Sequence, residues 1–180
     1  MNRDEALDLI KSKIKDDKLI KHMLAVEACM LNLAEYFGKD KEKWTLAGLL
    51  HDIDYEDTKD NPEEHGLRGI EYLKSFDITD DILQAIKVHV GFDEAKNKME
   101  TSLLASDALS GLIVACALVH PEGLSGLSTE FIMKKFKEKQ FARGADRENI
   151  KKCERMSLTI NEFISICLSG MKSIADDLSL

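Results

Sequence analysis

The chain has 180 residues, of which 44% are hydrophobic and 32% are charged, and it contains only 2 prolines and 10 glycines. This composition is typical of a folded chain with a substantial core, and it excludes a disordered protein and a sandwich or barrel with a turn every dozen or so residues. The net charge of −8 argues against broad nucleic-acid binding through phosphate neutralisation.

Apolar residues recur at helical spacing from the start of the chain. The spacing predicts three helices in the first part of the sequence, at residues 6–14, 19–37 and 41–51, and Gly38 is expected to close the second. The next segment, residues 52–62, carries five acidic residues and a proline. We predict that this acidic segment is a loop.

The remaining helices are predicted from their caps and from apolar periodicity. Asn61-Pro62 is typical of an N-cap followed by proline at the first helical position. The helices expected are 62–73, 80–90 (capped by Thr79 or Asp80 and ended by Gly91), 99–120 (stopped by Pro121), 131–136 and 147–168. No alternating run is long enough for a strand, so the sequence predicts an all-α fold, a single helical domain over residues 1–180.

Four cysteines, Cys29, Cys116, Cys153 and Cys167, stand far apart on apolar stretches. This spacing argues against a disulfide framework or a zinc–thiolate site. No apolar run approaches the ~20 residues that cross a bilayer, and the first five residues carry mixed charge instead of the apolar stretch of a secretory signal. We therefore expect a cytoplasmic protein that binds neither a membrane nor a nucleic acid.

Four of the five histidines fall on separate predicted helices or helix ends, beside apolar faces: His22, His51, His65 and His89. A lone buried histidine is more often a hydrogen-bonded core residue than a ligand, and His120, just before Pro121, is interpreted in that way. For the other four the combination with nearby carboxylates matters. Imidazole nitrogens together with carboxylate oxygens are typical of sites for Fe, Mn, Zn or Ni.

Two aspartates, Asp52 and Asp107, are the carboxylates that point most strongly to a metal site. Asp52 directly follows His51 at the end of an apolar helix, where a departure from helical dihedrals is expected to aim both side chains at one point. Asp107 stands in the middle of an apolar helix, where burying a carboxylate costs several kcal/mol unless a metal, arginine or lysine compensates it.

The order His22, His51-Asp52, Asp107 resembles the H…HD…D signature of the HD-domain superfamily of metal-dependent phosphohydrolases. The segment Gly48-Leu49-Leu50-His51-Asp52 matches its most recognisable part. His65 and His89 fit the extended H…HD…H…H…D pattern of members that bind two metals. The resemblance covers residues 18–118 and leaves residues 119–180 as a C-terminal helical extension.

The resemblance implies a role for each of these residues. His22, His51, Asp52 and Asp107 would bind one divalent transition metal, and Asp52 would bridge to a second metal held by His65 and His89. The metals (Mn, Fe, Zn or Ni) would bind a phosphate oxygen and lower the pKa of a shared water, which then attacks phosphorus. The implied activity is hydrolysis of a phosphoester or phosphoanhydride bond in a nucleotide or similar small metabolite, as in the similar bacterial diadenosine-tetraphosphate hydrolases.

Two other functions remain open. Inositol oxygenase and phosphonate oxygenase use a related His/Asp set, so the same ligands would also suit a di-iron oxygenase. A signalling or binding module would hold its ligand without turning it over, although such modules usually lose one or more of the metal ligands.

The acidic segment after Asp52 has two interpretations. Glu56-Asp57 resembles the acidic pair that follows the His-Asp in hydrolases of a guanosine alarmone, although residues 53–55 intervene here. Asp54, Glu56 and Asp57 are therefore either a solvated acidic loop or include a general acid/base beside the metals, for which Glu56 and Asp57 are the candidates.

Residues 134–155 form the one strongly basic stretch, with nine Lys/Arg against four Asp/Glu. Phosphate oxygens that touch no metal need donors, and arginine binds two oxygens at once. Arg143 and Arg147, which bracket a glycine turn, and Arg68, three residues after His65, are the candidate substrate contacts. A solvated basic face is the alternative interpretation of this stretch.

Overall fold

The computed structural model describes residues 1–180 and contains helices and turns without a strand, as expected for an all-α fold. The α-helices are α1 (Arg3–Lys13), α2 (Asp17–Phe37), α3 (Lys41–Leu50), α4 (Tyr55–Thr58), α5 (Leu67–Leu73), α6 (Asp80–His89), α7 (Lys98–Val119), α8 (Thr129–Lys137), α9 (Arg147–Lys151), α10 (Ile160–Ser173) and α11 (Ala175–Leu178). Two 3₁₀ helices, η1 (Pro62–Glu64) and η2 (Lys152–Met156), complete the secondary structure.

Short polar side chains fix the boundaries of the long helices. Asp16, Asp40 and Asn97 each accept a hydrogen bond from a backbone N–H in the first turn of α2, α3 and α7. Gly38 ends α2 with a left-handed φ of 59°, the conformation that favours glycine. These caps agree with the boundaries predicted from the sequence to within about two residues.

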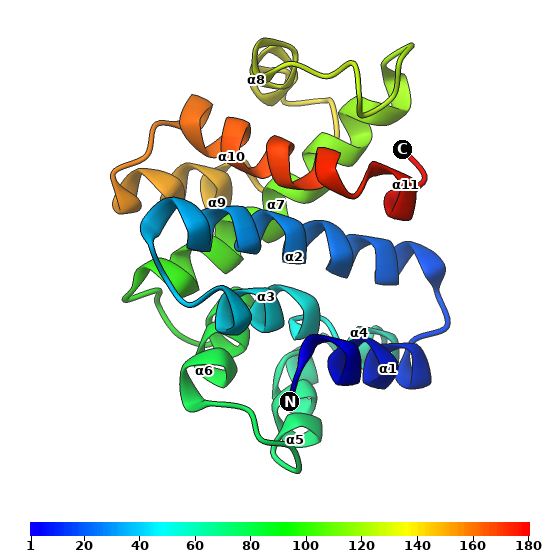
Figure 1. Ribbon diagram of the computed structural model, residues 1–180, viewed down its shortest axis with the longest axis vertical. Helices are drawn as coiled ribbons and strands as arrows, with labels where there is room; N and C mark the ends of the chain where they lie inside the picture. Colours follow the sequence, from blue (N-terminus) through cyan, green and yellow to red (C-terminus); the bar gives the residue numbers. More distant parts are fainter.

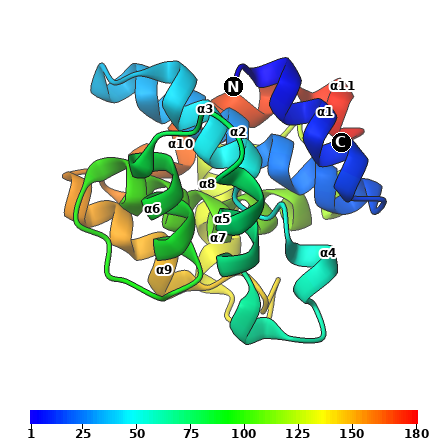
Figure 2. The same cartoon turned by 90° about the horizontal axis from the view of Figure 1, so that it is seen from below.

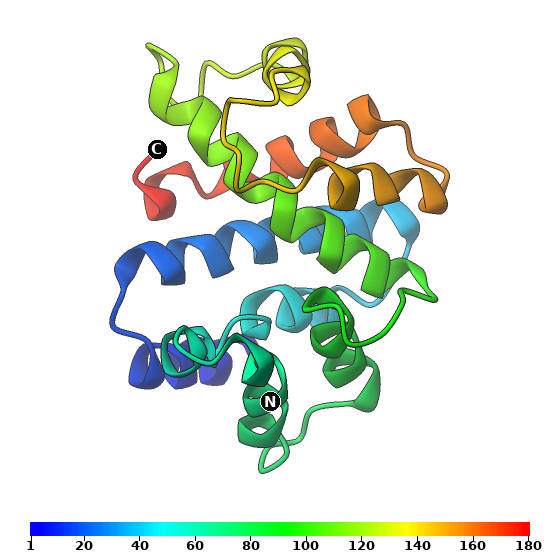
Figure 3. The ribbon, with the colours of Figure 1, turned by 180° about the vertical axis from the view of Figure 1, so that it is seen from behind.

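Helix α2 runs through the middle of the molecule and is covered on opposite sides (Figure 1). Helix α10 packs along one side, while α3 packs on the other side with α1 against it. Helix α7 crosses α2 from behind and contacts α6 and α9 as well (Figure 3). Helices α2, α3, α6 and α7 therefore approach one another around a common point, and each of them carries one of the predicted ligands.

Helix α7 differs from one expectation. An 18-residue window within it has a mean hydropathy of 2.0, so by length and composition this helix meets the criterion for a membrane span, although no apolar run of that kind was expected. In the fold, 61% of this window is buried inside the molecule, between α2, α6 and α9. The hydropathy is therefore explained by packing, since a helix that is apolar on all sides suits the centre of a helical protein.

The segments predicted as one loop and as one long C-terminal helix are both subdivided. Residues 52–62 contain the short helix α4. The single helix predicted over residues 62–73 is instead divided into η1 and α5 by Gly66, which has a φ of 77°. The helix predicted over 147–168 is interrupted at Ser157, which has a φ of 65°, and α10 begins at a capping box formed by Thr159 and Glu162. Periodicity alone does not detect such breaks because the apolar spacing continues across them.

The contact between α2 and α3 is unusually close. A Cβ atom added to Gly48 would lie 2.9 Å from Cα of Glu27, so only glycine allows this separation of the two backbones. Glu27 is itself buried, with 5% of its surface exposed, and forms an ion pair with Arg3 of α1. Because His51 follows Gly48 by three residues, the close approach sets the distance of His51 from α2.

We predict opposite effects for alanine at two helical glycines. Gly48→Ala should lower the free energy of unfolding by about 1–3 kcal/mol, because the added methyl group overpacks the α2–α3 contact. Gly111→Ala on α7 should raise it by about 0.5–1 kcal/mol, because nothing lies within 4 Å of the new Cβ and alanine is the better helix former. Urea denaturation of both variants under the same conditions measures the difference, and destabilisation by Gly111→Ala would contradict this account of the packing.

Candidate metal centre

Six side chains from different parts of the chain meet beside a cavity of about 640 Å³. His22 comes from α2, His51 from the end of α3 with Asp52 next to it, His65 from the end of η1, His89 from the last residue of α6, and Asp107 from the middle of α7. His51 is fully buried and lies beneath the other ligands, which line the cavity. The structure thus brings together all the residues that the sequence proposed as metal ligands.

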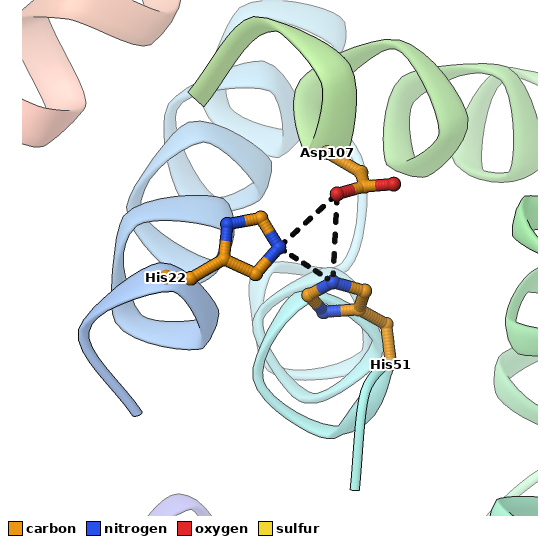
Figure 4. Close-up of side chains that lie close together, drawn as sticks. All are labelled: His22, His51 and Asp107. Atoms are coloured by element: carbon orange, nitrogen blue, oxygen red, sulfur yellow. Dashed lines mark hydrogen bonds and ion pairs between the residues drawn. The ribbon is translucent and has the colours of Figure 1, made fainter. Parts of the chain in front are cut away.

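The first set consists of His22, His51 and Asp107, which point toward one another (Figure 4). Nε2 of His22 lies 3.1 Å from Oδ1 of Asp107 and 3.2 Å from Nε2 of His51. Oδ2 of Asp52 faces the same set, at 3.6 Å from Nε2 of His22 and 3.4 Å from Nε2 of His51.

The second set lies on the other side of Asp52. Nε2 of His65 and Nε2 of His89 are each 3.3 Å from Oδ1 of Asp52. One oxygen of this carboxylate therefore faces His22 and His51 and the other faces His65 and His89, while His51 also lies close enough to Asp52 and His89 to share an ion with them. Ligand atoms about 2.1 Å from a single ion lie about 3 Å apart at neighbouring octahedral positions, so these separations match the chemistry of a metal centre.

The remaining nitrogen of each imidazole is already engaged. Nδ1 of His51 donates to the carbonyl of Gly48 at 2.8 Å, and Nδ1 of His89 donates to the carbonyl of Ile86 at 2.5 Å. Because carbonyl oxygens only accept hydrogen bonds, these partners assign the proton to Nδ1 and leave Nε2 with a lone pair. The lone pairs of both residues therefore point into the centre.

The same assignment holds for the other two histidines. Nδ1 of His22 lies 3.2 Å from Oγ of Ser110, whose own proton is donated to the carbonyl of Asp107, so the serine oxygen accepts from His22. Nδ1 of His65 donates to Oδ1 of Asp54 at 2.9 Å. Four Nε2 atoms and two carboxylates therefore face one another, and each Nε2 can bind a metal once it carries no proton. The donor set therefore fits a divalent transition metal.

The surroundings of His51 and His65 shift the pKa values of these two histidines in opposite directions. Burial lowers the pKa of His51 to about 4, so this imidazole is neutral and ready to bind a metal at neutral pH. Burial opposes the charged form of His65 too, but its hydrogen bonds with Asp52 and Asp54 outweigh that and raise the pKa of His65 to about 9. In the absence of metal His65 therefore carries a proton that a metal must displace.

Asp54 is a candidate functional residue whose position the sequence did not reveal. It is fully buried, in contrast to the solvated acidic loop that was one of the two interpretations of this segment. One carboxylate oxygen accepts from Nδ1 of His65, and the other accepts from the backbone N–H of Gly69 at 2.6 Å. Asp54 thus fixes the orientation of His65, a role that carboxylates commonly play behind metal-binding histidines. No local signal separates it from the exposed acids around it.

The geometry of the His-Asp pair differs in detail from the expectation. His51 keeps helical dihedrals, with a φ of −58° and a ψ of −35°, instead of departing from them. After it the chain tightens, with hydrogen bonds from the N–H of Ile53 to the carbonyl of Leu50 and from Tyr55 to Asp52. These hydrogen bonds between residues three apart are of the 3₁₀ type, in which successive side chains point about 120° apart. This rotation places the side chain of Asp52 beside that of His51.

The structure does not bring Glu56 and Asp57 to the centre. The carboxylate of Glu56 accepts hydrogen bonds from the backbone N–H groups of Lys15 and Asp16, so it stabilises the turn between α1 and α2. Asp57 is exposed and accepts a hydrogen bond from the hydroxyl of Tyr72. Neither side chain lines the cavity, so neither is placed to act as a general acid/base there.

The three candidate arginines are placed differently from one another. Arg68 is paired with Glu64 and donates to the carbonyl of Asp57, away from the cavity. Arg147 donates to the backbone carbonyls of residues 136, 141, 142 and 145 and so holds the preceding turn together. Arg143 is exposed, makes no ion pair, and adjoins Gly144, which lines the cavity with His22 and Asp107.

Two cavity residues were missed in the sequence. Lys18 lines the cavity and makes no ion pair, and it precedes His22 by one helical turn on α2. That i, i+4 spacing is the signal that identifies it, because such residues share one helix face. Tyr55 also lines the cavity, with its ring edge-on to His65 at 5.4 Å between centroids. In Figure 2 the connection between α8 and α9 lies between α9 and the segment formed by α4 and η1. Residues of α4, of η1, of α9 and of this connection line the cavity or the smaller cavity next to it.

Residues 19–121, more than half of the chain, match the protein family described as HD domain. All six ligands lie within this match, whereas Arg143 and Arg147 lie outside it. The chain is 27% identical to the tRNA (cytidine(56)-2'-O)-methyltransferase of Picrophilus torridus over a 182-residue alignment that covers 98% of this chain and 50% of that protein.

Shorter matches are found to ribonuclease Y. The identity is 36% over 97 residues with the protein of Lawsonia intracellularis, covering 52% of this chain and 18% of that protein. It is 37% over 89 residues with the protein of Aliarcobacter butzleri, covering 49% of this chain and 17% of that protein. The chain thus spans half the length of the Picrophilus protein and its match covers under a fifth of each ribonuclease.

We predict that metal binding depends on Asp52. Asp52→Ala removes the one carboxylate that faces both sets of nitrogens and should therefore abolish most of the bound metal while the helical circular dichroism persists. Metal analysis after purification without chelators measures this, and Glu56→Ala is the matched control because its carboxylate lies outside the centre. Full metal content in Asp52→Ala would show that the assignment is wrong.

A second prediction concerns the number of ions. Replacing His65 and His89 together by alanine should lower the metal content from about two ions per chain to about one, because only the set around His22 and His51 remains intact. The measurement is metal per chain after saturation and removal of excess ion. An unchanged content, or a wild-type content of one ion, contradicts a two-ion centre.

A third prediction follows from the raised pKa of His65. Below its pKa of about 9 the metal-free imidazole is protonated, so metal binding at this position must release a proton. The affinity for the second ion should rise by up to about tenfold per pH unit between pH 6 and 8, and His65→Ala should flatten that dependence. Titration calorimetry in buffers of different ionisation enthalpy counts the protons released; a count of zero for the wild type would contradict the prediction.

Proposed function

The chain belongs to the HD domain superfamily of metal-dependent phosphohydrolases, and from this premise we propose that it hydrolyses a phosphoester or phosphoanhydride bond in a nucleotide or similar small phosphorylated molecule. The placement of Asp52 between two sets of histidine nitrogens supports this function most directly. A carboxylate in this position would bridge two adjacent ions, which together would hold a phosphate and a nucleophile.

The four histidines and Asp52 have different roles in this reaction. When bound, divalent metal ions lower the pKa of a coordinated water toward neutrality and neutralise charge on phosphate oxygens. His22, His51, His65 and His89 hold their Nε2 atoms toward the ions through their Nδ1 hydrogen bonds. Both oxygens of Asp52 face imidazole nitrogens, so this carboxylate acts as a ligand and has no oxygen left to serve as a separate base.

Two cations without an ion pair lie at or next to the cavity. Lys18 on α2 lines it, and Arg143, on the turn before α9, is exposed and adjoins Gly144, which lines it. In a chain with a net charge of −8, free cations beside a group of carboxylates are suited to an anionic substrate. We assign Lys18 and Arg143 to the phosphate oxygens that the metals do not touch.

An RNA phosphodiester is a second candidate substrate. The identity to proteins named ribonuclease Y covers the region that holds the metal ligands, and hydrolysis of an RNA phosphodiester would need the same centre. The acidic net charge favours a small substrate, because long nucleic acids are bound mainly through many phosphate contacts.

The experiment that tests the function uses protein purified anaerobically and loaded with Mn²⁺, Fe²⁺, Zn²⁺ or Ni²⁺. Release of inorganic phosphate from nucleotides, of nucleotides from dinucleoside polyphosphates, and of fragments from single-stranded RNA are measured side by side. Turnover of any of these without oxygen supports a hydrolase. Oxygen-dependent turnover by a di-iron form supports the oxygenase alternative, and ligand binding without turnover supports a binding module.

We predict that Lys18 and Arg143 affect substrate binding but not metal binding. Lys18→Ala and Arg143→Ala should each raise KM by roughly tenfold, about 1.4 kcal/mol, at unchanged metal content. Arg143→Lys should recover part of the loss because it keeps the charge but not the paired donors. Lys21→Ala, on the same helix but paired with Asp17, is the control for charge alone.

Arg147→Ala should behave differently from Arg143→Ala. Its guanidinium donates hydrogen bonds to backbone carbonyls, so its removal should lower the melting temperature.

If Lys18→Ala and Arg143→Ala together leave KM unchanged, the two cations belong to a solvated face and do not bind substrate.

A further inference from the structure

The start of α2 and the turn before it form one wall of the cavity at the metal centre. Four residues of this part of the chain line the cavity: Asp16, Lys18, Leu19 and His22. Helix α1 ends at Lys13, Ile14 is extended with a φ of −107°, and α2 begins only at Asp17. Lys15 and Asp16 therefore lie outside both helices, and their backbone N–H groups find no partner within a helix.

A single side chain, that of Glu56 on α4, accepts from both of these N–H groups. Oε1 of Glu56 accepts from the N–H of Asp16 at 2.6 Å and from the N–H of Lys15 at 3.1 Å, and Oε2 also accepts from the N–H of Lys15 at 3.1 Å. Neither N–H makes a hydrogen bond to a backbone carbonyl. Glu56 lies 40 residues after Asp16 in the sequence, so this carboxylate is the tertiary contact that ties the turn to α4.

The hydrogen bonds of Glu56 lead on to Lys18. Asp16 is the N-cap of α2, and its side-chain Oδ1 accepts from the backbone N–H of Lys18 at 2.9 Å. Two consecutive hydrogen bonds thus connect the carboxylate of Glu56 with the backbone of Lys18, through the N–H and then the side chain of Asp16. A shift of the turn would therefore move the first turn of α2, which carries Lys18 into the wall of the cavity.

Glu56 also belongs to the opposite wall of the cavity through its neighbours in the chain. Asp54 accepts from Nδ1 of His65, and the ring of Tyr55 lines the cavity edge-on to His65. The next residue, Glu56, reaches across to the start of α2. The contact of Glu56 with the turn consequently fixes the separation of the wall that carries Lys18 from the wall that carries Tyr55 and His65.

We propose that Glu56 is a positioning residue for substrate binding, which holds Lys18 where phosphate oxygens need a donor beside the metals. Its carboxylate does not line the cavity, so it acts through Asp16 and Lys18 and not on the substrate. Small displacements matter at such a site, because a misplacement of about 1 Å can cost roughly 100-fold in rate. This inference rests on the proposed function and on the assignment of Lys18 to the phosphate.

Three substitutions of Glu56 separate reach from charge. Glu56→Ala removes the acceptors and should raise KM by roughly fivefold or more, with kcat changed less than twofold and metal content unchanged. Glu56→Gln keeps an acceptor oxygen at the same reach and should restore most of the loss. Glu56→Asp keeps the charge on a shorter side chain and should resemble Glu56→Ala. Asp57→Ala is the matched control, because this neighbouring carboxylate is exposed and bonds only to the hydroxyl of Tyr72.

A double-mutant cycle tests whether Glu56 acts through Lys18. In a Lys18→Ala background, Glu56→Ala should raise KM no further, because the group that it positions is already gone. A general structural role would instead give the same fold-change in both backgrounds. An undiminished effect of Glu56→Ala in the Lys18→Ala background, or a wild-type KM in Lys18→Ala alone, would overturn the inference.

Two measurements do not depend on turnover. Hydrogen exchange of the backbone N–H groups of Lys15 and Asp16, followed by NMR, should be at least tenfold faster in Glu56→Ala and unchanged in Asp57→Ala. Calorimetry with inorganic phosphate and metal-loaded protein should show equal weakening in Glu56→Ala and Lys18→Ala. Unchanged exchange or unchanged phosphate affinity in Glu56→Ala would overturn the inference. A wild type that binds phosphate but hydrolyses no phosphoester would overturn the proposed function alone, and the phosphate affinities of the variants would still decide the role of Glu56.

Discussion

Four imidazole Nε2 atoms and two carboxylates share one largely buried region of this protein, and the rest of the site is organised around them. Each imidazole has its Nδ1 proton bound by a carbonyl, a hydroxyl or a carboxylate, so each must present Nε2 inward. Without metal, a proton on His65 balances part of the carboxylate charge, and a bound divalent cation takes over that role. Metal binding and the stability of this region are therefore coupled.

Holding these groups in place requires a stiff frame, and the helices provide it. The ligands come from four long or medium helices and two tight turns, so no single helix determines the geometry. The close contact at Gly48 sets the distance between α2 and α3, and Asp54 fixes His65 from a fully buried position. This arrangement buries polar side chains, which is unfavourable unless they are hydrogen-bonded, and each buried side-chain nitrogen and oxygen has a partner.

Charge is distributed unevenly around this frame. Arg147 donates to backbone carbonyls, whereas Lys18 and Arg143 make no ion pair; Lys18 lines the cavity and Arg143 adjoins Gly144, which also lines it. The two arginines of one glycine turn thus have different tasks: Arg147 builds the turn, and Arg143 is left available at the edge of the site. The C-terminal extension is consequently part of the site's walls as well as a cover for α2 and α7.

The sequence by itself determined the helical class, most helix ends and the set of candidate ligands that the fold brings together, because caps, apolar periodicity and the His-Asp pattern are local or ordered features of the chain. It did not reveal that Ser157 interrupts the last predicted helix, that α7 is an apolar helix of membrane-spanning length inside the core, or that Asp54 is buried while Asp57 is exposed. Only the tertiary structure decided the different roles of residues with the same charge. Arg147 donates to carbonyls of the preceding turn while Arg143 stays exposed, and Asp54 is buried behind His65 while Glu56 accepts from the turn between α1 and α2, because each side chain meets different tertiary neighbours.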